Sequence, residues 1–256
     1  MTLKALVVTG YGINCENESK FCIEKSGGVA EIVHVNKILE TPKILEDYNM
    51  FFIPGGFAFG DDLGSGKVFG NKMKFKIKDQ LEGFVKAGKL VCGICNGFQA
   101  LVKMGLLPTP DFQQRVSLVG NDSGHFEDRW VILKTNTKSP CIYTKGLEHL
   151  LVPVRHGEGK FIPKDETVMK ELKENNQIVF QYVDENNNLA GYPYNPNGAV
   201  DNIAGICDKS GKIFGMMPHP EAFNIPENCP YWIKGVVKEA YGLRIFKNAV
   251  EFMKDY

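Results

Sequence analysis

The sequence predicts an α/β protein with a doubly wound, mostly parallel sheet that is flanked by helices and extended by antiparallel strands. Apolar runs alternate with helical segments over residues 1–104, a pattern typical of parallel strands joined by crossover helices. Turns such as Pro54-Gly55-Gly56 follow the carboxyl ends of these runs, where open parallel sheets place their sites. Beyond residue 115, short β-rich runs follow one another without long helices between them, which indicates added antiparallel strands.

The first half of the chain supplies the predicted parallel core. Asn14 is a candidate N-cap for the first helix, and Gly27-Gly28 closes that helix. A second helix begins at Met73 and stops before Gly88. The expected strands are 3–9, 29–35, 48–53 and 89–94, and the expected helices are 16–25 and 73–86.

The second half supplies the predicted antiparallel strands and a helical tail. The tail covers about 228–256, is helical from residue 231, and is expected to break near Gly242. We found no linker or internal repeat in the sequence, so we expect one domain spanning 1–256. The expected strands are 115–119, 130–135, 151–154, 177–183 and 212–217.

Composition excludes several classes of function. The 256 residues carry no formal net charge, so no electrostatic footprint for nucleic acid is present. The first apolar run is short and is expected to be a core strand, not a signal peptide or membrane span. Seven irregularly spaced cysteines are typical of a reducing compartment, so we expect a cytoplasmic location and no membrane partner.

The most informative segment is 90–99, with the sequence LVCGICNGFQ. An apolar strand ends near Gly93, a sharp turn is expected at Cys95, and a helix begins at Asn96 or Gly97. This is the strand–nucleophile–helix elbow, in which glycines on both sides leave room for a strained turn. The thiol would lie at a helix amino terminus, where free N–H groups and the dipole favour thiolate. The pattern predicts Cys95 as a nucleophile.

Two other interpretations of this segment stay open. Cys92 and Cys95 form a C-x-x-C pair, which occurs in dithiol redox motifs and as half of a zinc site. No second C-x-x-C is present in the sequence, so we expect no metal, and Cys92 lies within the predicted strand, which argues against redox chemistry. In the other interpretation, both residues are small buried core side chains.

A cysteine nucleophile needs a base and a group that orients the base. His219 follows the predicted strand 212–217, and Glu221 lies two residues further on. Both side chains would point to the same side of extended backbone, so Glu221 could reach the far imidazole nitrogen. We therefore predict Cys95, His219 and Glu221 as a catalytic triad.

A second histidine competes for the role of base. His156 lies in the segment Arg155-His156-Gly157-Glu158-Gly159 and also has a glutamate two residues on. Its glycines indicate a close approach of the backbone to another group. We rank it behind His219 as the base and predict a functional or interface loop that includes Arg155, His156 and Glu158.

Chemistry at a carbonyl group also needs donors for the developing oxyanion. The backbone N–H of Asn96, beside the nucleophile, is one candidate. Gly55 and Gly56 follow a buried strand, and their backbone can approach a ligand and present an N–H. A simple turn would also explain these glycines.

Together these motifs resemble a known family. The PGGF loop at 54–57, GICNGFQ at 93–99 and MMPHPE at 216–221 resemble the class I, triad-type glutamine amidotransferases, which have a flavodoxin-like fold. Within that class, the chain is most similar to the glutaminase subunits of phosphoribosylformylglycinamidine synthases, enzymes of purine biosynthesis, from about residue 3 to 223. The finer motifs are GINCE at 12–16, GD at 60–61, GLLP at 105–108, HGEG at 156–159 and NPNG at 195–198.

The resemblance implies a mechanism. Cys95 would attack the side-chain amide of glutamine, His219 would protonate the departing ammonia, and water would hydrolyse the γ-glutamyl thioester. Gln99 matches the position that helps to bind the α-amino acid group of glutamine. Two departures stand out: Ala58 and Phe59 replace polar residues of many relatives, and 224–256 matches no motif.

The resemblance also implies a partner. Ammonia would pass to a synthetase subunit that uses ATP and Mg to convert formylglycinamide ribonucleotide into formylglycinamidine ribonucleotide. This sequence has no G-x-x-x-x-G-K-[ST] motif, so we expect no cofactor here and a synthetase on a separate polypeptide. Whether a small third subunit joins the complex stays open.

Two alternative functions come from different classes. The chain could be a class I amidotransferase that serves another acceptor, and only the finer motifs argue against this. It could also be a non-enzymatic binding subunit or thiol sensor that uses Cys92 and Cys95. The presence of Cys95, His219 and Glu221 together argues against the second alternative.

Overall fold

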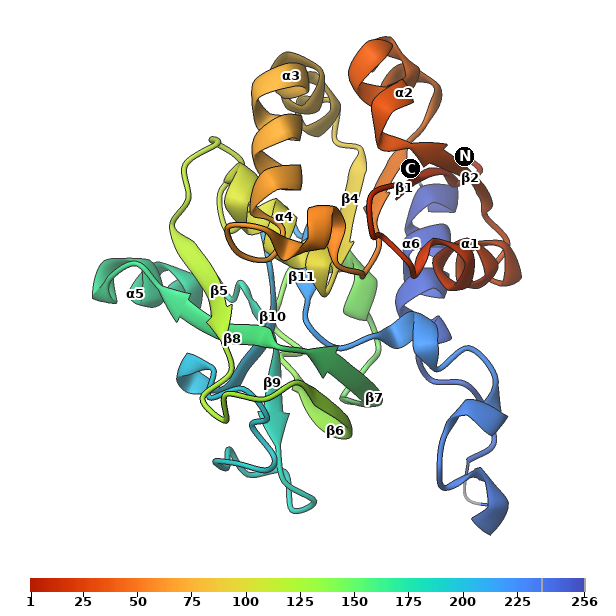
Figure 1. Cartoon of the computed structure of the whole chain (residues 1–256). Coiled ribbons are helices and arrows are strands. Elements are labelled where there is room, and N and C mark those ends of the chain that lie inside the picture. The colour runs from red at the N-terminus through yellow and green to blue at the C-terminus, as the bar shows by residue number, and fades with distance from the viewer. Residues whose placement is uncertain (236, 256) are drawn as a thin grey trace.

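The structure is a computed structural model that describes residues 1–235 and 237–255 (Figure 1). The strands are β1 (Lys4–Thr9), β2 (Val29–His34), β3 (Met50–Ile53), β4 (Leu90–Ile94), β5 (Val116–Gly120), β6 (Glu127–Thr135), β7 (His149–His156), β8 (Glu158–Pro163), β9 (Ile178–Val183), β10 (Ile203–Cys207) and β11 (Ile213–Met216). The α-helices are α1 (Glu16–Lys25), α2 (Val35–Glu40), α3 (Lys67–Lys86), α4 (Asn96–Met104), α5 (Glu166–Glu174) and α6 (Leu243–Asp255).

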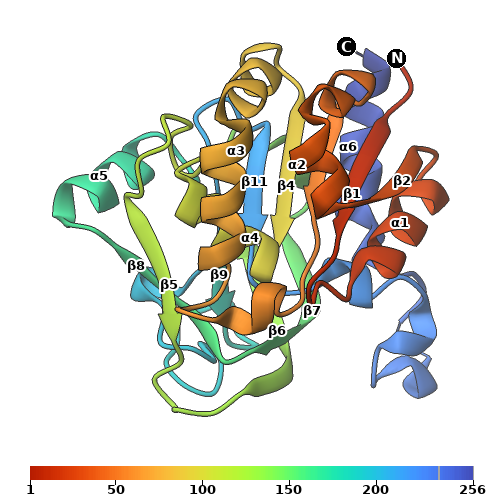
Figure 2. The same ribbon diagram turned by 45° about the horizontal axis from the view of Figure 1, so that its top comes forward.

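A nine-stranded mixed sheet forms the centre of the protein, in the order β2-β1-β3-β4-β11-β10-β9-β6-β7. The first five strands of this order are parallel, in the arrangement of flavodoxin-like sheets. Helices α2, α3 and α4 lie over one face of these strands, and α1 and α6 lie over the other (Figure 2). Every residue of β3 and β4 is buried, as expected for parallel strands covered on both faces. The predicted fold class is confirmed.

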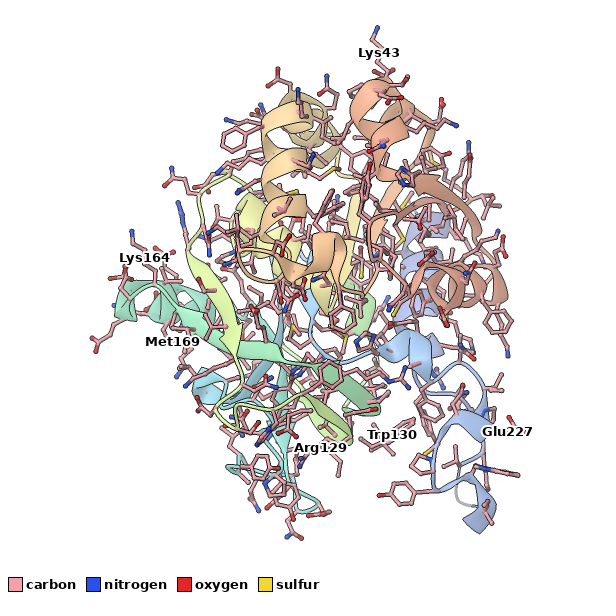
Figure 3. All side chains as sticks on the ribbon, in the orientation of Figure 1. Lys43, Arg129, Trp130, Lys164, Met169 and Glu227 are labelled. Carbon is pink, nitrogen blue, oxygen red and sulfur yellow. The ribbon has the colours of Figure 1, made fainter. Side chains whose placement is uncertain are left out.

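Strands β10, β9, β6 and β7 extend the parallel core by antiparallel pairing. This extension turns back below the carboxyl ends of the parallel strands (Figure 1). The backbone N–H of His219, after β11, therefore donates a hydrogen bond to the carbonyl of Pro153 in β7 at 2.8 Å. Trp130 of β6, labelled in Figure 3, packs edge-on against Phe223 at 5.3 Å between ring centroids.

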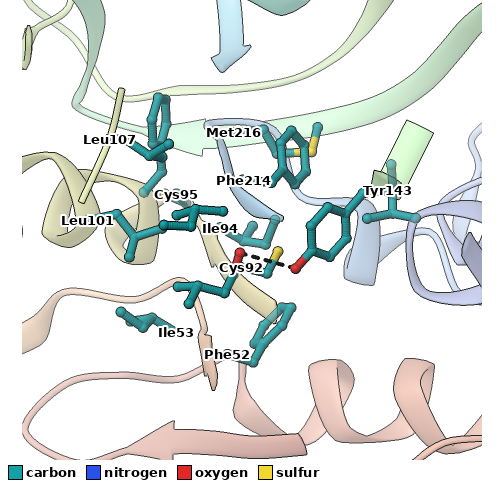
Figure 4. Close-up of a cluster of buried hydrophobic side chains, with 14 of the residues drawn as sticks. Phe52, Ile53, Cys92, Ile94, Cys95, Leu101, Leu107, Tyr143, Phe214 and Met216 are labelled. Atoms are coloured by element: carbon teal, nitrogen blue, oxygen red, sulfur yellow. Dashed lines mark hydrogen bonds between the residues drawn. The ribbon is translucent and has the colours of Figure 1, made fainter. Parts of the chain in front are cut away.

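The core beneath β4 is apolar and closely packed (Figure 4). Cys92 has no exposed surface, and burial, followed by the nearby Glu221 charge, raises the pKa of its thiol well above the usual value. The ring of Tyr143 stacks on Phe214, and its hydroxyl donates to the carbonyl of Val91 at 3.1 Å. Cys92 is thus a core residue, as one of the alternative interpretations predicted.

The predicted strands are present with end shifts of a few residues, but other elements were missed. Helix α2 has only six residues and follows β2 directly, so it is too short to show the repeating apolar pattern that identifies a helix in a sequence. Helix α5 begins at an Asp165 cap that accepts from the N–H of Val168 at 3.0 Å; it is nine residues long and lies in a region where no long helix was expected. Strands β8 and β10 were not predicted. The start of β8 was interpreted as part of the loop at 155–159, and the segment of β10 was not assigned.

Helix α1 begins at Glu16, as predicted, but its predicted cap and the predicted start of the next long helix are wrong. Helix α1 is preceded by Cys15, not Asn14, at the N-cap, because the N–H groups of both residues donate to the carbonyl of Gly55 at 3.2–3.3 Å. Helix α3 begins at Lys67, six residues before the predicted start. The missed turn contains Gly70, whose missing side chain lets α3 approach α4, since a Cβ there would lie 3.1 Å from the carbonyl oxygen of Ala100.

The predicted helical tail is only partly correct. Residues 236 and 256 lie outside the described residues, and in the rest of 228–255 the α-helix begins only at Leu243. Pro230 and Gly235 interrupt the segment before it, which contains a short 3-10 turn. The predicted break at Gly242 has a packing cause, because a Cβ there would lie 2.0 Å from the carbonyl oxygen of Pro220.

We predict that Gly97→Ala strongly destabilises the fold. A Cβ at Gly97 would lie 1.9 Å from the carbonyl oxygen of Ile53, a rigid backbone atom of β3. Overpacking of this kind costs about 1–3 kcal/mol or more. Gly83→Ala is the matched control, because a Cβ there meets nothing within 4 Å, and the substitution should stabilise α3 by about 0.5–1 kcal/mol. Urea unfolding measures both, and equal effects would contradict the packing argument.

Candidate active site

The segments that follow β1, β3, β4 and β11 meet at the carboxyl edge of the parallel strands. The N–H of Phe57, after β3, donates to the carbonyl of Gly12, after β1, at 2.8 Å. The N–H of Cys95, after β4, donates to the carbonyl of Met216 at the end of β11 at 2.8 Å. This edge brings the predicted nucleophile, the PGGF loop and the His219 segment together, as the position of sites in open α/β sheets requires.

Cys95 occupies the predicted sharp turn between β4 and α4. Its backbone has φ 51° and ψ −108°, a conformation that costs a non-glycine residue about 1–3 kcal/mol. Both flanking glycines are needed, because a Cβ at Gly93 would lie 2.6 Å from the backbone of Gly97. The Cys95 Sγ lies 3.6 Å from the carbonyl oxygen of Arg155. The thiol is therefore held at the start of α4, where free N–H groups favour a negative charge.

His219 and Glu221 form a buried pair beside this thiol. The Nδ1 atom of His219 lies 2.6 Å from Oε1 of Glu221, and both side chains are buried. Glu221 reaches the ring through a 3-10 turn at Pro220–Ala222, so the prediction of extended backbone between them is wrong. Burial lowers the pKa of His219, but the charges of Glu221 and Cys95 outweigh it and hold this pKa well above the usual value.

The second ring nitrogen of His219 is available for proton transfer. Nε2 is buried and has no hydrogen-bond partner within residues 1–235 and 237–255. Since Nδ1 faces Glu221, the carboxylate keeps a proton on Nδ1 in both the charged and the neutral ring, so Nε2 is the nitrogen that gains and loses a proton. The nearby charge of Cys95 contributes to the raised pKa of His219. The group can therefore act as nucleophile, base and orienting carboxylate.

The predicted oxyanion loop lies against His219. A Cβ at Gly55 would lie 2.6 Å from Cε1 of His219, so only glycine fits there. Gly56 has φ +148° and pairs with Ile13 in an isolated bridge. In the described part of the chain, neither the Gly55 nor the Gly56 N–H has a hydrogen-bond acceptor. These free donors suit an oxyanion.

Asn96 and Gln99 link α4 to two neighbouring loops. The Asn96 side chain accepts from the N–H of Ala58 at 3.1 Å and donates to Oδ1 of Asp61 at 2.8 Å. The Gln99 amide donates to the carbonyl of Glu158, and its oxygen accepts from Asn96 at 3.0 Å. Ala58 thus contributes its backbone N–H to this network. A polar side chain at position 58 is therefore not needed for these hydrogen bonds.

His156 is buried, and both of its ring nitrogens face amide groups. Its Nδ1 lies 3.1 Å from Oδ1 of Asn121, and its Nε2 lies 3.5 Å from Nδ2 of Asn197. Burial, and secondly the charge of His219, lowers the pKa of His156 to about 3, so the ring is neutral. Both ring nitrogens of His156, the second candidate base, therefore face side-chain amides. The adjacent Arg155 side chain is exposed, and its interface role stays a prediction.

Three residues near the site were missed in the sequence. Cys15 places its Sγ 4.0 Å from Nδ1 of His219, and burial raises the pKa of its thiol. Asn121 and Asn197 enclose His156. Cys15 belongs to a motif that follows a strand, which was an available signal, whereas nothing local marks Asn121 as a partner of a histidine 35 residues away.

Comparisons with known proteins place the chain in a family. Residues 2–253 match the family model of the CobB/CobQ-like glutamine amidotransferase domain. A Methanococcus maripaludis protein named phosphoribosylformylglycinamidine synthase subunit PurQ is 47% identical, with 97% of each chain covered. The protein of the same name from Dehalococcoides mccartyi is 41% identical, with 98% of each chain covered.

A solved structure agrees with these relatives. A chain of PurLQS from Thermotoga maritima superposes with a TM-score of 0.73 at 28% identity, covering 99% of this chain and all of that one. No helix among the described residues is long and apolar enough to cross a membrane. The chain belongs to the glutamine amidotransferase family of PurQ subunits.

We predict that His156→Gln destabilises the protein less as the pH falls. The folded-state pKa of His156, about 3, lies below its ordinary value of about 6.5. Below pH 6.5 the unfolded wild-type protein therefore binds a proton that the folded protein does not, and its free energy of unfolding falls. The difference between the two proteins should shrink by roughly 2 kcal/mol from pH 7 to pH 5. Urea unfolding at several pH values measures it. His149→Gln, at an exposed site, is the control, and a pH-independent difference would show that His156 is not held neutral.

Proposed function

We propose that this chain, as a member of the PurQ family, hydrolyses glutamine to glutamate and ammonia and delivers the ammonia to a synthetase subunit. The observation that supports it most is the buried His219–Glu221 pair, 2.6 Å apart, beside a thiol at a strained helix start. The assignment of catalytic roles to Cys95, His219 and Glu221 is our proposal. We also propose that residues 1–256 form a single glutamine amidotransferase domain.

In the first half of the reaction, the Cys95 thiolate attacks the side-chain amide carbon of glutamine. The negative charge that develops on the oxygen is stabilised by N–H groups of Gly55, Gly56 and Asn96. His219 then transfers its Nε2 proton to the amide nitrogen, the carbon–nitrogen bond breaks, and ammonia leaves. A γ-glutamyl thioester on Cys95 and a neutral His219 remain.

In the second half, His219 acts as a general base. Its Nε2 removes a proton from water, which attacks the thioester carbon, and the carbon–sulfur bond breaks to release glutamate. Glu221 stabilises the positive charge that His219 carries in both halves, and it fixes the ring orientation. Each cycle restores the starting protonation of Cys95 and His219.

Gln99 is proposed to position the α-amino acid group of glutamine. It lies one helical turn after Cys95, and its side chain is already oriented by Asn96 and by the carbonyl of Glu158. This links substrate binding to the loop at 155–159. That loop is also a candidate contact with the synthetase, because Arg155 is exposed at its start.

The partner and its product are inferred from the family. Relatives are subunits of phosphoribosylformylglycinamidine synthase, and the Thermotoga maritima neighbour comes from PurLQS. We propose a synthetase partner that uses ATP and Mg to make formylglycinamidine ribonucleotide, with no cofactor in this chain and a cytoplasmic location. A small third subunit is compatible with this proposal. A thiol sensor at Cys92 is disfavoured, because this thiol is buried and its pKa is raised.

The first test is labelling with a glutamine-mimicking diazo ketone, followed by mass-spectrometric mapping. We expect one adduct, on Cys95, that excess glutamine suppresses. The experiment is repeated with the synthetase present, because the site can require its partner for assembly. Labelling of Cys92 or Cys15 instead, or no adduct in either condition, would refute the proposal.

A second prediction concerns Glu221→Gln. The amide keeps the shape of the carboxylate but donates a hydrogen to Nδ1, so it holds His219 in the wrong tautomer and removes the charge that stabilises imidazolium. We expect kcat for glutamine hydrolysis to fall by up to about 10⁴-fold, with a small change in KM. Glu227→Gln, on an exposed turn, is the control. Near wild-type activity of Glu221→Gln would remove this residue from the triad.

A further inference from the structure

Cys15, His219 and Glu221 form a compact group of three different donor atoms. One ligand atom from each residue lies within 4.8 Å of the others. Around a tetrahedral zinc ion, sulfur at about 2.3 Å and nitrogen or oxygen at about 2.0–2.2 Å lie roughly 3–4 Å from one another. The 4.0 Å between Cys15 Sγ and His219 Nδ1 is therefore close to the separation that two zinc ligands require.

One donor of this group is unused. The Oε2 atom of Glu221 is buried and has no hydrogen-bond partner within the described residues, whereas Oε1 faces His219. A buried carboxylate oxygen without a partner carries a substantial desolvation cost. A cation next to Oε2 would remove that cost. Cys15 is only partly buried, so an ion has a route from solvent to this group.

We propose that Cys15, His219 Nδ1 and Glu221 form an inhibitory binding site for a divalent zinc-like cation. The three residues supply the sulfur, nitrogen and oxygen ligands that zinc prefers, and a water molecule takes the fourth position. Binding displaces the protons of the Cys15 thiol and of Nδ1 into solvent. The remaining imidazole proton is then on Nε2.

The inhibitory effect rests on the proposed function. With Nδ1 bound to the cation, His219 cannot accept a second proton at Nε2, and it can donate its one proton only by becoming imidazolate. It also loses the hydrogen bond that links Nδ1 to Oε1 of Glu221 at 2.6 Å. Both the general-acid and the general-base roles are therefore blocked. Cys15 contacts His219 at Nδ1, not at Nε2, where the proposed proton transfer takes place, so Cys15→Ala retains the nucleophile and the proton-transferring nitrogen.

The binding test uses the metal-free full chain with Cys95→Ser, which removes the other thiol beside His219. Calorimetric titration should show one zinc ion per chain, and cobalt should give a thiolate-to-metal charge-transfer band. Adding Cys15→Ala should abolish the band and weaken zinc binding by at least about 100-fold, since losing even an outer partner costs 10–100-fold. Adding Cys229→Ala, which removes a thiol that the cluster does not contain, should change neither. Unchanged binding after Cys15→Ala would overturn the site.

The activity test separates this inference from the proposed function. In chains that retain Cys95, zinc should inhibit glutaminase activity, and a chelator should reverse the inhibition. Relative to its own zinc-free rate, Cys15→Ala should require at least tenfold more zinc for the same inhibition. Equal sensitivity of Cys15→Ala and wild type would overturn the inhibitory role. If the metal-free protein with its synthetase lacks glutaminase activity, the proposed function fails, and the binding measurement still decides whether the site exists.

Discussion

The site depends on how tightly the backbone of the turn at Cys95 fits between two strands. The N–H of Cys95 is bonded to the carbonyl of Met216, and Gly97 lies so close to Ile53 that no side chain fits. These contacts fix the turn from both sides and hold Cys95 in its left-handed conformation. The cost of that conformation, about 1–3 kcal/mol, is offset by the burial of the surrounding strands. A rigid sheet thereby determines where the thiol and the start of α4 lie.

The antiparallel extension completes what the parallel core begins. The parallel core places Cys95 and the PGGF loop at one edge of the sheet. The segment after β11, which carries His219, is attached to this core only through β11 itself. Because β7 returns below this edge, Pro153 accepts from the backbone of His219 and Arg155 presents its carbonyl to Cys95. The contact between Trp130 and Phe223 holds the same segment further along. The added strands therefore belong to the architecture of the site.

The parts of the fold and site that could be predicted from the sequence are those with local causes. The glycines around Cys95 and the position of His219 after a strand are contained in short segments, and the structure brings these segments together. Asn121 was missed because its neighbour His156 is defined only by the folded chain. Cys15 lies in a motif after a strand, and only its contact with His219 required the folded chain. Helix α5 was missed although its cap and amphipathic pattern are local. The start of α3 was predicted six residues too late, and the missed turn contains Gly70, where close packing against α4 outweighs the low helix propensity of glycine.

The two His-x-Glu segments show why residue spacing alone does not define a catalytic pair. Glu221 turns back to His219 and leaves no amide between them. Glu158 points away from His156, with Oε2 accepting from the N–H of Ser65 at 3.2 Å, and amides occupy both nitrogens of that ring. Without a carboxylate to stabilise the cation, burial keeps His156 neutral. Its hydrogen bond to Asn121 holds the loop whose carbonyl groups contact Cys95 and Gln99, and the proposed proton transfer is assigned to His219.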